Sequence, residues 1–342
     1  MGRSPEPEAR SRIAAVPGMA ADQVLEALRA AALAPSTHNT QPWRFRVAEG
    51  AFEVWADPSR RLPVADPDDR QLRLACGAAL FNLRLAVSRA GHMPHTTMLP
   101  DPEHPLLLGR VRVGAAGVAD PPTLALARAM ADRRTNRHPF FPEPVPAPQR
   151  AALRRAAETE HARLLLIEDP DQRRSLQELV HTAHRTQQAD PAFRAELQRW
   201  TGHAGARSDG VPAALGGPRP ELQDQWVLRD FTGGTARERV PGKDFEPHPL
   251  IAVLYSFTDS PLDQLRSGQA LQRVLLTATT EGLVSSFLSQ PVEQAAQRRK
   301  LRRLLGDSRW PQALLRIGYG SPTAASPRRS VEETLIVDPP VD

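Results

Sequence analysis

The sequence predicts an α+β protein made of two similar modules in tandem, with a long insertion in the second module. A repeated pattern supports the two modules: a helical block with a glycine is followed fourteen residues later by another glycine, and then by an Arg-hydrophobic-Gly string. Coincidence in an alanine-rich chain is the alternative, but the shared order and spacing favour duplication. The two copies are Gly77-Ala78-Ala79-Leu80, Gly91 and Arg112-Val113-Gly114, and Gly268-Gln269-Ala270-Leu271, Gly282 and Arg316-Ile317-Gly318.

Composition limits the classes of partner. The 342 residues carry a formal net charge of +5, and 40% of them are apolar. Almost all basic residues are arginines that are interleaved with acids along the chain, so we expect no nucleic-acid partner. No apolar run approaches the ~18 residues of a membrane span, and residues 1–19 lack the apolar core of a signal peptide. We expect a flexible tail over residues 1–19, no membrane contact and a cytoplasmic location. Cys76 is the only cysteine, which excludes an intramolecular disulfide.

The first module is expected over residues 20–125. An apolar helix should end before Pro35, because a proline disfavours helical geometry in the residue before it. Two alternating strands can pair through the turn at Glu49-Gly50. The predicted elements are helix 20–33, strands 43–47 and 52–55, helix 71–90 and strand 106–114.

The second module is expected over residues 130–342. Residues 201–249 are rich in glycine, proline and charge, and a loop of this length is either disordered or a lid. Trp226, Phe231 and Phe245 favour a lid, because disordered linkers are poor in aromatic residues. The other predicted elements are helix 149–158, strand 162–167, helices 171–188 and 191–200, strand 250–257, helix 262–280, helix 292–305 and strand 311–319.

The turn between the first helix and the first strand carries the most specific string. Taken alone, Ser and Asn here could simply satisfy free backbone groups of an ordinary turn. The whole string resembles the Pro-Ser-x-x-Asn-x-Gln-Pro-Trp element of the flavin-dependent nitroreductase superfamily, and further strings resemble its actinobacterial Acg-type branch. The resemblance implies that this element lies along the isoalloxazine and ribityl chain of FMN. The residues carried over are Pro35, Ser36, Thr37, Asn39 and Gln41.

A second string follows the junction between the modules. The run from Arg133 to Arg137 places three arginines and a hydroxyl within five residues, which suits a phosphate because guanidinium groups pair bidentately with it. A solvated basic turn is the alternative. The string resembles the Arg-x-Ser-x-Arg/Lys element that holds the FMN phosphate in nitroreductases, with threonine in place of serine. The residues carried over are Arg133, Arg134, Thr135 and Arg137.

Two further segments join the resemblance. Arg328 and Arg329 stand in a string similar to the family's closing Arg-Arg-x-x-Glu-Glu, which implies contact with the same phosphate; pairing with Glu332 and Glu333 is the alternative. Ser289 and Gln290 fall in the segment that passes along the flavin ring in the family, although they could also simply begin a helix.

Each module lacks the string that the other supplies. Nitroreductases are typically homodimers with two FMN sites across the interface, so the resemblance implies a fused pseudo-dimer with the nitroreductase fold and one FMN per chain. The chain should then be a monomer or a weak homodimer. The sequence has no G-x-G-x-x-G string, so NAD(P)H would act as a transient reductant docked on the flavin.

The function has two open interpretations. One is an NAD(P)H-dependent oxidoreductase that acts on nitroaromatics, quinones or a small metabolite. The other is a flavin-storage protein whose lid covers FMN. A flavin-free module that binds a partner is a remote third possibility. FMN would carry the chemistry, so the sequence assigns no catalytic side chain. It assigns no metal site either, because His181 and His184, three residues apart on a helix, have no third ligand near them in the sequence.

Overall fold

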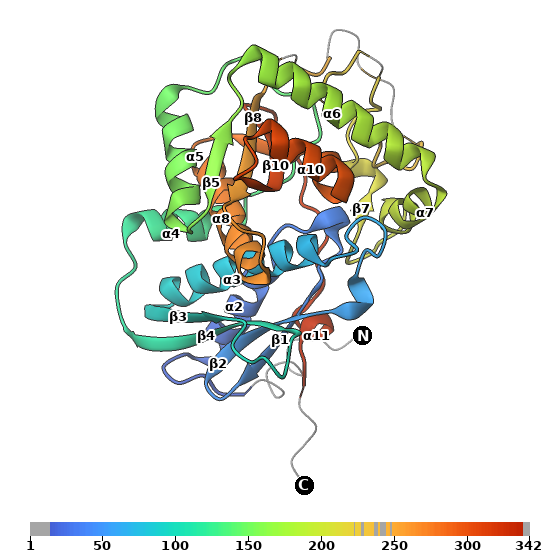
Figure 1. Cartoon of the computed structure of the whole chain (residues 1–342). Helices are drawn as coiled ribbons and strands as arrows, with labels where there is room; N and C mark the ends of the chain where they lie inside the picture. The colour runs from blue at the N-terminus through green and yellow to red at the C-terminus, as the bar shows by residue number, and fades with distance from the viewer. Residues whose placement is uncertain are drawn as a thin grey trace.

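The described part of the chain forms two antiparallel four-stranded sheets with two long helices crossing between them, and a small parallel sheet of two short strands (Figure 1). The computed structural model describes residues 14–221, 223–226, 229–235, 239, 244–246 and 248–337. The four-stranded sheets lie on opposite sides of the helix pair α3 (Arg70–Arg89) and α8 (Pro261–Thr280), so both helices contribute to the space between the sheets.

The first half contains a sheet with the strand order β1-β2-β4-β3. β3 was missed by the sequence analysis because its residues alternate only between half-buried and exposed positions, and Pro94 interrupts the pattern. Proline is tolerated there because β3 is an edge strand. The elements are α2 (Ala21–Ala32), η1 (Thr37–Asn39), β1 (Trp43–Ala48), β2 (Ala51–Ala56), η2 (Pro58–Arg60), α3 (Arg70–Arg89), β3 (His92–Met98), β4 (Leu107–Ala116) and α4 (Pro121–Ala129).

The second half contains a sheet with the order β5-β8-β10-β9. The single helix expected over residues 292–305 is wrong, because the Gln294 backbone is extended and separates α9 from α10. The elements are α5 (Ala147–Thr159), β5 (Arg163–Leu166), α6 (Pro170–Ala189), α7 (Pro191–Trp200), β6 (Thr201–His203), β7 (Val211–Pro212), η3 (Ala213–Leu215), β8 (Leu250–Ser256), α8 (Pro261–Thr280), β9 (Val284–Phe287), α9 (Gln290–Glu293), α10 (Ala295–Leu304), β10 (Trp310–Gly318) and α11 (Val331–Thr334).

The two halves agree in strand order and in register. Arg112 of β4 pairs with Ala51, as Arg316 of β10 pairs with Ile251. Both ladders shift register at the same place before these arginines, next to Leu107 in β4 and Pro311 in β10. Gly91 and Gly282 follow the two long helices and both have a positive φ. This left-handed geometry favours glycine after a helix end.

The two long helices cross in backbone contact. A Cβ atom on Gly77 would lie 2.2 Å from the carbonyl oxygen of Leu265, and one on Gly268 would lie 2.2 Å from that of Leu74. Both distances are far below van der Waals contact, so each crossing position requires glycine. The repeated glycine of the sequence is therefore the point at which α3 and α8 meet.

The main hydrophobic cluster of each half includes residues from the other half. Leu265 and Leu276 of α8 pack in the cluster of the first sheet, and Leu74 of α3 packs in that of the second. The C-terminal segment also returns to the first half, where the Ile336 amide donates to the Phe45 carbonyl (2.7 Å). The boundaries at residues 125 and 130 thus divide the sequence but not the core.

Part of the expected N-terminal tail lies against the first half of the fold. Residues 1–13 of the expected tail lie outside the described residues. Val16 is only 3% exposed and packs in the first core with Met19, and the Gly18 carbonyl is hydrogen-bonded to the His92 ring (2.8 Å). Residues 16–19 thus contact the first half of the fold, and the flexibility of residues 1–19 stays a prediction.

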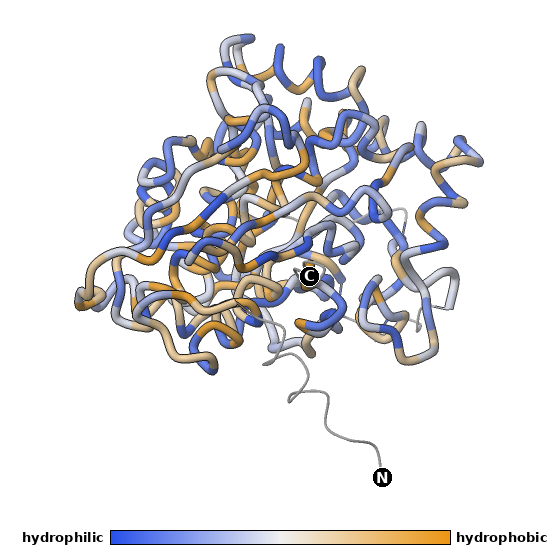
Figure 2. Tube along the Cα trace, turned by 90° about the horizontal axis from the view of Figure 1, so that it is seen from below, coloured by the Kyte–Doolittle hydropathy of each residue, from blue (hydrophilic) through white to orange (hydrophobic). Residues whose placement is uncertain are grey.

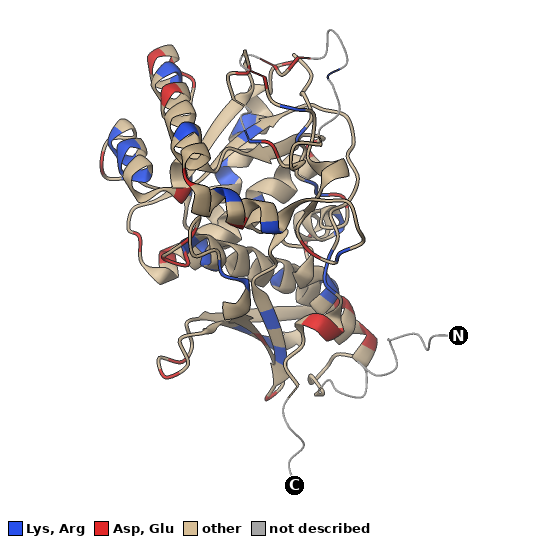
Figure 3. Ribbon diagram, turned by 90° about the vertical axis from the view of Figure 1, so that its right-hand side faces the viewer, with Lys and Arg blue, Asp and Glu red and all other residues tan. Residues whose placement is uncertain are grey.

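Hydrophilic and charged positions are spread over much of the chain. Hydrophilic and hydrophobic positions alternate along the outer helices in Figure 2. Basic and acidic positions are interspersed over the face drawn in Figure 3. Among the described residues, no helix is both long and apolar enough to cross a membrane.

The helix crossing gives a stability test. Alanine normally stabilises a helix interior by about 1 kcal/mol relative to glycine. Gly77→Ala should instead lower the free energy of unfolding by about 1–3 kcal/mol, because its methyl group would overlap backbone atoms of α8. Urea denaturation measures the difference. The control is Gly205→Ala, where no atom lies within 4 Å of the added carbon. A stabilised Gly77→Ala variant would contradict the close crossing.

Candidate functional site

The turn that joins α2 to β1, residues 33–42, is held in an unusual backbone conformation. His38, Asn39 and Gln41 all have a positive φ, in the left-handed region that L-residues rarely adopt. The Ser36 hydroxyl oxygen accepts a hydrogen bond from the Gln41 amide (2.9 Å) and closes the turn. Such strain persists where the surroundings enforce it, and it is concentrated at functional sites. We call this turn the elbow.

A cavity lies beside the elbow, between the two long helices and the second sheet. It encloses about 730 Å³ of empty space, open solvent included. Its apolar surface comes from α3, α8 and β10, with Leu74, Leu271 and Leu314. A largely apolar lining with a few polar groups is typical of a small-molecule site. Six of the predicted site residues line it: Pro35, Ser36, Thr37, Thr135, Arg137 and Ser289.

The segment that carries Thr135 and Arg137 is fixed to β9. The Asn136 amide donates to the Ser285 carbonyl (2.9 Å), and the Asn136 side chain donates to the Ser321 carbonyl (2.8 Å). From the other side, the buried Arg316 guanidinium donates to the His138 carbonyl (3.0 Å). These bonds hold residues 135–137 at the cavity while Asn136 itself is fully buried.

Four arginines form a cationic cluster next to the cavity: Arg133, Arg134, Arg137 and Arg328. Arg133 is 5% exposed, and its Nε and Nη1 atoms are buried with no hydrogen-bond partner among the described residues. Burial, with the neighbouring guanidinium groups, lowers the pKa of Arg133 to about 9. Burial likewise lowers the pKa values of Arg137 and Arg328 to about 10.

No carboxylate neutralises this cluster within the described part of the chain. None of its four guanidinium groups takes part in an ion pair there, whereas Arg60, Arg229 and Arg316 all do. Burying a cation without a counter-charge is costly. The arrangement therefore suits an anionic ligand with several acceptor oxygens.

The side-chain amides of Asn39 and Gln41, two of the predicted site residues, form hydrogen bonds within the protein. The Asn39 side chain donates to the carbonyls of Gly210 (2.9 Å) and Pro327 (3.0 Å) and accepts from Arg328 (2.9 Å). The Gln41 side chain donates to the Ser208 carbonyl (2.8 Å) and accepts from the Arg329 amide (2.8 Å). Neither side chain lines the cavity. They connect the elbow to residues 208–210 and to the C-terminal segment, and their contact with FMN stays a prediction.

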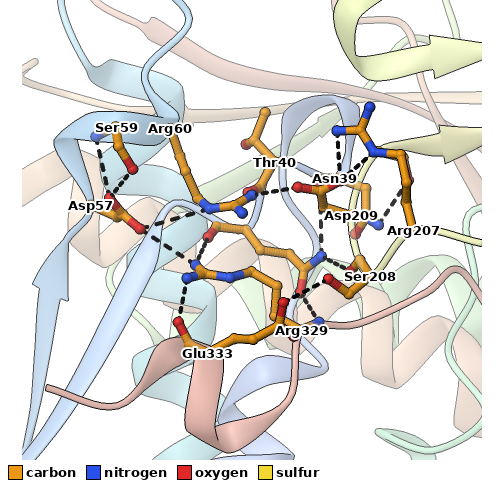
Figure 4. A network of polar contacts seen from close by, with 12 residues as sticks. Asn39, Thr40, Asp57, Ser59, Arg60, Arg207, Ser208, Asp209, Arg329 and Glu333 are labelled. Carbon is orange, nitrogen blue, oxygen red and sulfur yellow. Dashed lines mark hydrogen bonds and ion pairs between the residues drawn. The ribbon is translucent and has the colours of Figure 1, made fainter.

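Arg329 lies in a network behind the elbow (Figure 4). Its guanidinium donates to the Gln41 carbonyl (3.3 Å) and lies 3.4 Å from the Asp57 carboxylate. Arg60 extends the network to Asp209, 2.9 Å away. Of the two adjacent C-terminal arginines, Arg328 joins the cationic cluster and Arg329 fastens the chain segments around the elbow.

The remaining predicted residues lie at the edges of the site. The half-buried Arg134 side chain donates to the Arg133 carbonyl (2.9 Å). Gln290 is buried and lines a smaller adjoining cavity together with Ser289, Arg137 and Phe231. Ser289 is thus shared by both cavities.

Within the expected insertion, the described residues Arg229 and Phe231 lie at the two cavities. The Arg229 guanidinium pairs with Glu293 (2.6 Å), and the two side chains are 3% and 0% exposed. It also donates to the Gln187 side chain (2.6 Å). Phe231 lines the cavity with its ring 4.6 Å from the Arg137 guanidinium. Sequence reasoning missed Arg229, Glu293 and Gln187 because they come from three separate segments with no shared motif.

His38 is the other residue that sequence reasoning missed. Its side chain is buried, lines the cavity and lies 6.2 Å from Phe231 between ring centroids. Its Nε2 atom has no hydrogen-bond partner among the described residues. Burial, with the Arg229 charge, lowers the pKa of His38 to about 3, so the ring is neutral at neutral pH. It occupies a variable position of the elbow string, which explains why the motif gave no signal for it.

Comparisons with known proteins agree with the resemblance. The model of the nitroreductase family matches residues 130–319. A Mycobacterium tuberculosis H37Rv protein named as a candidate NAD(P)H nitroreductase is 32% identical over 320 residues, covering 92% of this chain and 91% of the relative. Acg of the same strain, also named as a candidate NAD(P)H nitroreductase, is 31% identical over 322 residues, covering 92% and 96%. A crystal structure of a Bacteroides fragilis nitroreductase with bound FMN gives a TM-score of 0.37 at 14% identity, covering 60% of this chain and 92% of that one.

His38 predicts a component of acid sensitivity. The unfolded chain binds a proton at this position below about pH 6.5, whereas the folded chain stays neutral there down to about pH 3. Stability is therefore lost as the pH falls through this window, at up to about 1.4 kcal/mol per pH unit. His38→Gln should remove the part of this pH dependence that His38 causes. The free energy of unfolding of the variant should therefore fall less steeply than that of wild type between about pH 6.5 and 4.

Urea denaturation at several pH values measures the slopes. The control is Thr97→Gln, at an exposed position of β3, which removes no titratable group and should retain the wild-type slope. Parallel curves for wild type and His38→Gln would contradict the burial of a neutral imidazole.

Proposed function

Because the chain belongs to the nitroreductase family, we propose that it is an FMN-dependent oxidoreductase that takes electrons from NAD(P)H. The observation that carries the proposal is the buried Arg133, whose Nε and Nη1 donors have no partner among the described residues. A phosphate dianion offers acceptor oxygens and the opposite charge, and guanidinium groups bind it bidentately. Arg133, Arg137 and Arg328 would share it.

The other residues of the cavity suit the rest of FMN. The hydroxyls of Ser36, Thr37 and Thr135 line it and are donors and acceptors for a ribityl chain. Apolar side chains from α3, α8 and β10 offer a surface for a planar ring. FMN supplies hydride exchange when bound, while the protein binds it, orients it and limits the access of water.

We also propose one FMN per chain in a fused pair of modules. The agreement in strand order and register supports the fusion. The second half has no counterpart of the elbow, since only residues 160–162 connect α5 to β5. Glu160 in this connection forms ion pairs with Arg84 (2.6 Å) and Arg273 (3.1 Å). These side chains therefore lie where the second half would need an elbow to hold a second FMN. A pair of modules within one chain removes the need for a partner subunit. This supports a monomer or a weak homodimer.

The electron acceptor would be a nitroaromatic, a quinone or a small metabolite. Flavin storage is the second candidate function, and the Arg229–Glu293 ion pair is the observation that favours it. This pair fastens Arg229 beside the cavity, where the nearby Phe231 lies against Arg137. We propose that this segment acts as a lid, and its rate of opening then decides between turnover and storage.

The phosphate assignment predicts opposite effects on binding and stability. Arg133→Met should weaken FMN binding by about tenfold or more, because charge-assisted hydrogen bonds contribute roughly 1.5–3 kcal/mol. The flavin-free variant should be more stable than flavin-free wild type, because a buried unpaired cation is removed. FMN titration and thermal unfolding measure both effects. The exposed Arg128→Met on α4 is the control.

Arg133→Ala combined with Arg137→Ala should abolish flavin retention during purification. If this double variant stays yellow, the phosphate is held elsewhere. Wild-type protein without a flavin absorption band would contradict both the reductase and the storage proposals.

The lid proposal is tested by removing the ion pair as a unit. The double variant Arg229→Met with Glu293→Met removes both charges. A single substitution would instead leave an unpaired buried charge, which would destabilise the protein. Anaerobic mixing with NADH or NADPH then measures the bleaching of bound flavin. Rapid bleaching of wild type supports the oxidoreductase, and slow wild-type bleaching that accelerates about tenfold or more in the variant supports storage behind a lid.

Equally slow bleaching in both proteins, with normal reduction by dithionite, would rule out NAD(P)H as the reductant. The exposed pair Arg174 and Asp171, replaced in the same way, is the control for loss of an ion pair.

A further inference from the structure

We propose that Arg316 is a positioning residue that makes the candidate site prefer FMN over riboflavin, the same flavin without its phosphate. Its guanidinium holds the backbone on both sides of Arg137, so that the side chains of Thr135 and Arg137 face the phosphate. The inference rests on the proposed function and adds to it the residue that sets the selection of the phosphorylated cofactor.

The first argument is the orientation of the segment that carries the arginine fork. Thr135 and Arg137 line the cavity, whereas Asn136 between them is fully buried. Side chains alternate in this way along an extended chain, and Thr135 forms a bridge to Ser285 next to β9 as a strand residue would. A rotation of this segment would therefore turn the hydroxyl and the guanidinium away from the cavity together. Binding of a phosphate thus depends on how the backbone of these residues is held.

The second argument is the set of contacts that Arg316 makes. Its guanidinium donates to the carbonyls of Asn136 (3.4 Å) and His138 (3.0 Å), which precede and follow Arg137 in the chain. A planar guanidinium has several donors in a fixed fork and can hold both carbonyls at once. Its central carbon lies 3.9 Å from the centroid of the Phe140 ring. Arg316 therefore contacts the segment at three places and limits its rotation.

The third argument separates position from charge. Arg316 forms an ion pair with Glu246 (2.8 Å), and the two side chains are 1% and 5% exposed. The Glu246 carboxylate also accepts from the Phe140 amide (2.7 Å). Arg316 lines neither the large cavity nor the smaller one beside it. Its charge is thus neutralised within the protein, unlike that of Arg133, and it acts on a phosphate through the geometry of the segment.

The fourth argument comes from the duplicated arginine. Arg112 of β4 occupies the place that Arg316 occupies in β10. Arg112 is exposed, and its side chain makes no hydrogen bond or ion pair in the described part of the chain. The strand itself therefore does not require a buried arginine at this position. The burial and the carbonyl contacts are found in the half that carries the arginine fork.

The test compares the Kd values of FMN and riboflavin for flavin-free protein, measured by the quenching of flavin fluorescence. Arg316→Met with Glu246→Gln removes both charges and keeps an acceptor for the Phe140 amide, while Arg316→Lys keeps the cation but loses the planar fork. Each should weaken FMN binding by about tenfold or more and riboflavin binding by less than about threefold. The control, Arg112→Met, should leave both Kd values unchanged. Circular dichroism checks that every variant is folded.

Equal losses for FMN and riboflavin would make Arg316 a purely structural residue, and unchanged FMN binding in both variants would remove it from the site. Wild-type FMN affinity in Arg316→Lys, with a loss in the double variant, would assign the effect to charge instead of position. Wild type that binds riboflavin as tightly as FMN would contradict the phosphate assignment. Wild type that binds neither flavin would contradict the proposed function itself.

Discussion

The backbone contact of α3 and α8 at Gly77 and Gly268 is the constraint on which the rest of the structure depends. It brings the two sheets close enough that each helix enters the hydrophobic core of the other half. Because the helices lie so close together, both of them line the cavity, α3 with Leu74 and α8 with Leu271. A looser crossing would separate the elbow from the arginines that face it.

Several arginines near that crossing are buried, although burying a charged group costs free energy. Buried arginines with protein partners, such as Arg229 and Arg316, support the segments that border the cavity. Arg133 differs, because its Nε and Nη1 donors meet no acceptor in the described part of the chain. The contrast between paired and unpaired guanidinium groups distinguishes arginines that hold the fold from those that suit a ligand, which composition alone does not reveal.

Much of the fold follows from patterns that are local in sequence. The repeated glycines, the Glu49-Gly50 hairpin and the long amphipathic helices are local signals, and the structure contains all of them. The polar edge strand β3 and the break at Gln294 were missed because neither has a hydrophobic period of its own. At the site, motif strings located the elbow and the arginine fork. They did not separate Arg328 from Arg329, or reveal His38, because those roles depend on partners far away in the chain.

The contacts of the elbow also have a consequence for the order in which the protein forms. Asn39 and Gln41 find their partners near residues 208–210 and at residues 327–329, so their hydrogen bonds span most of the chain. During synthesis, the elbow is therefore made early but can be completed only when nearly the whole polypeptide has emerged. Contacts of such large sequence separation slow folding. A chain that is cut short near its C-terminus would keep both helices of the crossing and still lack a finished binding site.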